Sequence, residues 1–138
     1  MKLITLLQIA AVLHLGLVWA GATMPRAVNL RVHLAALPPF IRRLFWVYFT
    51  FIGLTLLGFG GITFCYAAAI AAGAPLARAL CVFLALFWTA RLIVALFVFD
   101  VSPYLTRWFY RLGHYTITAI FIYLAAIYAW AALLGGNK

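Results

Sequence analysis

The chain has 138 residues, of which 70% are hydrophobic and 8% are charged, and it carries one carboxylate side chain against ten lysines and arginines. This composition excludes a water-soluble domain, because a surface exposed to water has to be polar. It also excludes acid–base catalysis by paired carboxylates, since Asp100 is the only acidic side chain. The composition predicts a small integral membrane protein, and the length suits a single domain over residues 1–138.

Four apolar runs predict four transmembrane helices. They cover residues 3–23, 44–73, 76–99 and 112–135, and each exceeds the ~20 residues that cross about 30 Å of hydrocarbon. A backbone in hydrocarbon must pair all its polar groups, and no run alternates apolar with polar residues as membrane strands do. We therefore expect an all-α, polytopic protein, whose second run is long enough to tilt or to project beyond the bilayer.

The link between the first two runs, residues 24–43, is not a plain loop. Apolar residues alternate there with Arg31 and His33, and Pro38-Pro39 then breaks the chain. This pattern predicts a short helical segment in the membrane interface, with Val32 and Leu34 dipping toward the hydrocarbon.

The link before the fourth run begins with a helix-start signal. Ser102 is a candidate N-cap, and Pro103 fits the first helical position, where no N–H is needed. We expect a short helix over residues 103–111 ahead of the fourth span. Aromatic residues gather at the end of the first run, at the start of the second and in the link before the fourth. They predict an aromatic belt at the cytoplasmic interface: Trp19, Phe45, Trp46, Tyr48, Tyr104, Trp108, Phe109 and Tyr110.

The basic residues predict the orientation. The first and third links carry six of them, Arg26, Arg31, Arg42, Arg43, Arg107 and Arg111, and the opposite side carries three, Lys2, Arg78 and Lys138. Because positive residues mark the cytoplasmic side, both termini are expected outside the cytoplasm, in a bacterial inner membrane. With no soluble module to present these cations, we expect membrane lipids as partners and no nucleic acid.

Arg91 is the first candidate functional residue. It lies thirteen residues past Arg78, so roughly 20 Å below the outer surface at 1.5 Å per residue. A cation at that depth faces a bundle interior, a partner or a bound anion, or else snorkels to the headgroups. Trp88 lies three residues earlier on the same face and is a candidate cation–π partner.

His14 is the second candidate. It lies twelve residues past Lys2, so roughly 18 Å deep, close to the depth of Arg91. Two polar groups at one level predict one internal site between the first and third spans, with His14, Arg91 and Trp88 as cofactor-binding residues and His14 as the metal ligand. The alternative is a plain interhelical hydrogen bond from His14.

Asp100 is out of phase with Arg91 on the same helix, so the two should not pair. A structural polar cluster of Asp100 with Arg107, Arg111 and His114 is expected at the cytoplasmic end.

Three short segments carry a family resemblance. The end of the first span reads Trp19-Ala20-Gly21 and then Pro25-Arg26, the third span contains Trp88-Thr89-Ala90-Arg91-Leu92, and Arg111 begins the fourth span. The layout resembles the HemJ-type protoporphyrinogen oxidases, small four-helix membrane proteins of haem synthesis. Those have Lys where this chain has Arg91, and an Asn-Glu pair where it has His114-Tyr115. Their early histidine falls nearest Gln8, or on His14 if residues are skipped.

The resemblance implies haem or another porphyrin as the cofactor, with His14 as its ligand and Arg91 facing a carboxylate. No catalytic motif appears in the sequence, so whether the protein is an enzyme stays open. Three functions are expected: a non-enzymatic accessory or assembly subunit that packs on other membrane proteins or on itself, a haem- or quinone-binding redox protein, and an oligomeric channel for small solutes or anions.

Overall fold

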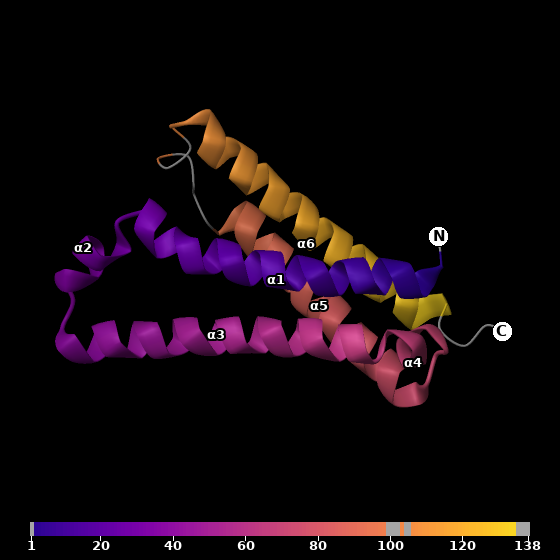
Figure 1. The fold of residues 1–138 in the computed structure, drawn as a ribbon. Helices are drawn as coiled ribbons and strands as arrows, with labels where there is room; N and C mark the ends of the chain where they lie inside the picture. Colours follow the sequence, from indigo (N-terminus) through magenta and orange to yellow (C-terminus); the bar gives the residue numbers. More distant parts are fainter. Residues whose placement is uncertain (1, 99–102, 104–105, 135–138) are drawn as a thin grey trace.

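The computed structural model describes residues 2–98, 103 and 106–134, and every regular element in these ranges is a helix (Figure 1). In chain order the helices are α1 (Leu3–Ala27), α2 (Leu30–Ala35), α3 (Pro39–Cys65), α4 (Ala67–Ala71), α5 (Pro75–Phe97) and α6 (Trp108–Leu134). The long helices α1, α3, α5 and α6 are each long and apolar enough to cross a membrane. The predicted all-α fold with four membrane-spanning candidates is confirmed.

The long helices pack as two pairs. α5 lies along α6, α1 lies along α3, and α1 joins the pairs through contacts with α6 and α4. The start of α1 and the end of α6 lie at the same end of the bundle, while α2 and the starts of α3 and α6 lie at the other (Figure 1). The core between them is apolar and is built mainly from α1, α5 and α6, including Leu7, Leu17, Leu84, Leu124 and Ile127.

The second apolar run was predicted as one span, and this prediction is wrong at its end. The helix stops at Cys65, and the chain turns at Tyr66 into the short helix α4. The turn brings Ala67 and Ile70 into the core, where they are 3% and 2% exposed. Burial of these two apolar side chains favours the observed break. The helix also starts earlier than predicted, at Pro39 instead of residue 44. Proline is tolerated there because the first turn of a helix does not need its missing N–H.

The first link contains a short helix, α2, as predicted. Asn29 precedes it with a left-handed backbone, at φ 49° and ψ 42°. Leu34 is buried within the protein, whereas Val32 is 72% exposed. The two residues therefore face different surroundings, and the position of α2 in a membrane interface stays a prediction.

The fourth span begins earlier than predicted. Residues 108–111 were expected in a separate short helix, but Trp108 starts α6, which continues unbroken to Leu134. Nothing between Arg111 and Leu112 interrupts a helix, so the aromatic turn extends the span. The proposed cap, Ser102, lies outside the described residues.

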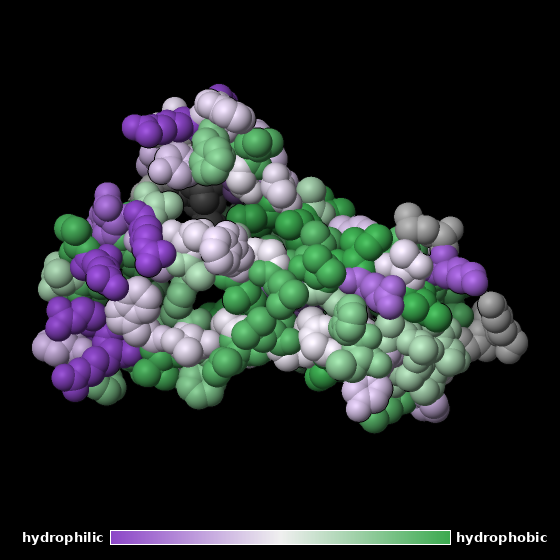
Figure 2. All heavy atoms as spheres, in the orientation of Figure 1, coloured by the Kyte–Doolittle hydropathy of each residue, from purple (hydrophilic) through white to green (hydrophobic). Residues whose placement is uncertain are grey.

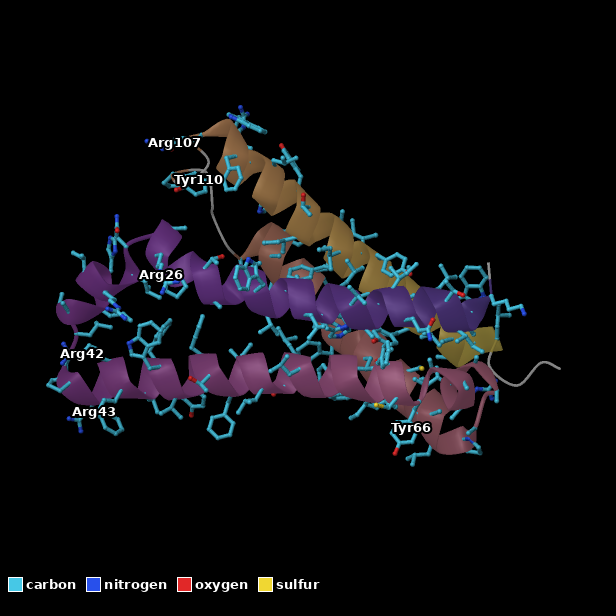
Figure 3. The ribbon with its side chains drawn as sticks, in the orientation of Figure 1. Arg26, Arg42, Arg43, Tyr66, Arg107 and Tyr110 are labelled. Carbon is cyan, nitrogen blue, oxygen red and sulfur yellow. The ribbon has the colours of Figure 1, made fainter. Side chains whose placement is uncertain are left out.

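Polar and apolar side chains are segregated along the bundle. Figure 2 shows hydrophilic residues gathered over α2 and the start of α3 and again at the start of α6, with hydrophobic residues along the middle. Arg26, Arg42, Arg43 and Arg107 all lie at this end (Figure 3). Contact of this basic end with lipid headgroups stays a prediction.

Candidate functional site

His14 lies where the four long helices meet. It is completely buried on the inward face of α1, together with Leu7, Ala10 and Leu17. Aromatic rings from the other three helices surround its imidazole, with centroid distances of 5.2 Å to Trp88 of α5, 6.1 Å to Tyr128 of α6 and 6.5 Å to Phe59 of α3. The rings meet edge to face, an arrangement that aromatic groups favour.

The hydrogen bond of His14 defines its tautomer. Nδ1 lies 2.7 Å from the carbonyl oxygen of Ala10. A carbonyl only accepts, so Nδ1 carries the hydrogen and donates, and in the neutral ring Nε2 then holds a lone pair. Nε2 is buried and has no hydrogen-bond partner among the described residues.

Trp88 carries the complementary unsatisfied group. Its side chain is 1% exposed, and its Nε1–H, which only donates, also lacks a partner in the described part of the chain. Buried polar groups almost always have partners, so two adjacent exceptions mark this place as unusual. A hydrogen-bond donor for Nε2 of His14 and an acceptor for Nε1 of Trp88 would satisfy these two groups.

Arg91 lies at the outer edge of the same aromatic group. Its Cζ is 5.6 Å from the centroid of the Phe121 ring, and that ring lies 5.4 Å from the ring of Trp88. Arg91 is exposed, whereas His14 is fully buried. The structure thus brings His14 and Trp88 into contact and connects Arg91 to them through Phe121.

Thr63 and Tyr128 form a second polar contact that the sequence analysis missed. Their hydroxyl oxygens are 2.7 Å apart, and both side chains are fully buried. This hydrogen bond joins α3 to α6, and the ring of Tyr128 also contacts the imidazole of His14. The available signal was a hydroxyl residue in the middle of each of two apolar runs, a pattern that favours interhelical hydrogen bonds.

The expected polar cluster stays a prediction, because Asp100 lies outside the described residues. Arg107 accepts a backbone hydrogen bond from Arg111 at the start of α6, and both side chains are exposed. His114 is half-buried, with its ring 5.8 Å from that of Tyr115.

Haem does not fit His14 as it is packed here. Nε2 has the lone pair that an axial ligand needs, but it is enclosed by the rings of Trp88, Tyr128 and Phe59. A porphyrin plane bound through Nε2 would overlap these rings, so α1 and α5 would have to separate first. No group of three or more His, Cys, Asp or Glu side chains suited to a metal ion occurs within the described ranges.

Fold and site together define a small helical bundle with four helices long and apolar enough to cross a membrane. A buried histidine–tryptophan pair lies at the centre of its described part. No protein-family model matches the chain, and neither a curated protein nor a solved structure matches it. The resemblance to HemJ-type oxidases stays a prediction.

Proposed function

We propose that the protein is a non-enzymatic accessory or assembly subunit of a membrane, which packs through its helix faces on other membrane proteins or on copies of itself. The observation that carries this proposal is the outer face of α3. Only Gly60 and Thr63 are buried among the 27 residues of this helix. In an apolar stretch of 18 residues within α3, 11% of the residues are buried, whereas 28% are buried in the corresponding stretches of α1 and α6.

The glycines of α3 support association with another helix. A Cβ placed on Gly53, Gly58 or Gly61 would meet no atom within 4 Å, whereas one on Gly60 would lie 3.0 Å from Cβ of His14 in α1. Membrane helices associate where small residues let backbones approach closely. The bundle itself uses one of these glycines for close approach, and the others leave room for a neighbour.

The proposal is tested by adding bulk to the open glycines. Gly61→Leu is expected to reduce association in lipid nanodiscs and co-purification of partners from native membranes by about tenfold, or about 1.4 kcal/mol, because the added side chain keeps the backbones apart. Gly16→Leu on α1 is the matched control, since a Cβ there also meets nothing within 4 Å. A monomer that retains no partner, or equal effects of both variants, would contradict the proposal.

A redox function is the second candidate, and the unsatisfied nitrogens of His14 and Trp88 support it. A quinol hydroxyl donates and accepts at once, so it has the polarity that these two atoms need. Like a porphyrin, a quinol would require α1 and α5 to separate before it reached Nε2. An absorbance spectrum of the detergent-purified protein tests for bound haem or quinone. His14→Phe should abolish any such signal, whereas a colourless protein free of extractable quinone would exclude this function.

The proposed subunit is expected in a bacterial inner membrane, with both termini outside the cytoplasm. The six basic residues at the α2 end support this orientation, because they would then face the cytoplasmic headgroups.

A further inference from the structure

The junction of α2 and α3 contains an open pocket of about 390 Å³, lined by Arg31, Arg42 and Trp46. Arg31 comes from α2, and the other two residues come from the first two turns of α3. The turn at Pro38 places side chains that are eleven residues apart in the sequence around one hollow. Figure 3 shows this end of the bundle, with Arg42 at the junction.

The described part of the chain offers the two guanidinium groups in this pocket no carboxylate side chain. Residues 2–98, 103 and 106–134 contain no Asp or Glu at all. Guanidinium groups are cations, and two like charges in one hollow repel each other. An anion placed between them removes this repulsion and gains charge-assisted hydrogen bonds.

Trp46 adds a donor and an apolar wall. It lies four residues after Arg42, so both side chains project from the same face of α3. Its ring packs edge to face against Phe45 and Phe49, at centroid distances of 5.8 Å and 5.7 Å, which fixes the indole in place. Tryptophan favours the headgroup level of a bilayer, where its ring contacts apolar groups and its N–H contacts oxygen.

We propose that this pocket binds a phosphate group, supplied by the headgroup of an anionic phospholipid. Guanidinium groups match phosphate oxygens in pairs, and the start of α3 adds the positive end of its helix dipole. The pocket volume lies within the range of about 300–1,000 Å³ that small-molecule sites occupy, so it holds the glycerol beside the phosphate as well. Phosphatidylglycerol fits this charge, whereas phosphatidylcholine would bring a cation against two arginines.

The test measures lipid retention by the full-length protein in native mass spectrometry, with phosphatidylglycerol or phosphatidylcholine added. The wild type should retain phosphatidylglycerol about tenfold better, and Arg42→Gln should remove that preference, because one charge-assisted contact is worth about a factor of ten. Arg43→Gln is the matched control: it removes the same charge one residue away, on a side chain that points away from α2 in Figure 3.

A second arm separates the two sources of phosphate. Millimolar inorganic phosphate should leave the phosphatidylglycerol in place if the lipid is the ligand. Displacement of the lipid by inorganic phosphate in the wild type would overturn the lipid assignment and indicate a free phosphate. Equal retention of both lipids, or equal losses in Arg42→Gln and Arg43→Gln, would overturn the site itself. Arg42→Lys keeps the positive charge but lacks the paired N–H donors of a guanidinium group. It should therefore retain only part of the preference for phosphatidylglycerol that Arg42→Gln removes.

Discussion

At Gly60 the backbones of α1 and α3 come into direct contact. A Cβ at residue 60 would lie 3.0 Å from Cβ of His14 and 3.2 Å from the carbonyl oxygen of Ala11. Neither atom is the end of a flexible side chain, so an alanine at residue 60 requires α1 to move away by a few tenths of an ångström. The position of His14 among the aromatic rings therefore depends on a missing methyl group on the neighbouring helix.

Gly60→Ala is expected to lower the free energy of unfolding by about 1–3 kcal/mol, the usual cost of forcing an extra carbon into a packed core. Gly61→Ala is the control, because its Cβ meets nothing within 4 Å and alanine raises helix propensity by about 0.5–1 kcal/mol. Circular dichroism during SDS titration of the purified protein measures both. A Gly60→Ala variant as stable as the control would show that α1 and α3 do not approach this closely.

The hydrogen bond between Thr63 and Tyr128 can be measured by a double-mutant cycle. Thr63→Val and Tyr128→Phe each remove one hydroxyl, and their coupling energy is expected at about 0.5–1.5 kcal/mol, as for other hydrogen bonds between membrane helices. Additive effects of the two substitutions in the same SDS titration would argue that the hydroxyls do not bond.

At the scale of elements, the link between α1 and α2 depends on the backbone of Asn29. Its positive φ is a conformation that asparagine tolerates and that β-branched side chains resist. This conformation lets α1 end at Ala27 and α2 start at Leu30 in a new direction. Leu34 then anchors α2 to the protein, which places Arg31 near α3.

Asn29→Val is expected to destabilise α2 by about 1–2 kcal/mol, the cost of a left-handed backbone at a side chain that resists it. Asn29→Gly should be neutral, since glycine adopts positive φ freely. Hydrogen–deuterium exchange over residues 30–35 reports this locally: exchange should accelerate in the valine variant alone. Unchanged exchange in Asn29→Val would mean that the link relaxes without the left-handed residue.

For the whole molecule, the distribution of charge predicts how the bundle sits in a membrane. The start of α1 and the end of α6 share one end (Figure 1). Four basic residues labelled in Figure 3, Arg26, Arg42, Arg43 and Arg107, share the other. In a bilayer we therefore expect the start of α1 and the end of α6 on one side and the four arginines on the other.

A reporter fused after Lys138 tests on which side of the membrane the C-terminus lies. Alkaline phosphatase should be active there and green fluorescent protein dark, because the basic end is expected in the cytoplasm. Replacing Arg42 and Arg43 with glutamine while adding lysines after Lys138 should shift part of the population to the opposite orientation. A fluorescent C-terminal fusion in the unaltered chain would contradict the predicted orientation.

The sequence by itself predicted four long apolar helices, because the length and hydropathy of a run are local properties. It misplaced the end of the second helix and the start of the fourth. It also singled out His14 and Trp88 by their depth and spacing. Only the tertiary structure decided that these two side chains meet, that Arg91 contacts Phe121, and that the chain turns at Tyr66. These outcomes depend on how each helix is rotated about its axis. That rotation is set by contacts between distant residues, such as Gly60 against His14, which no single apolar run contains.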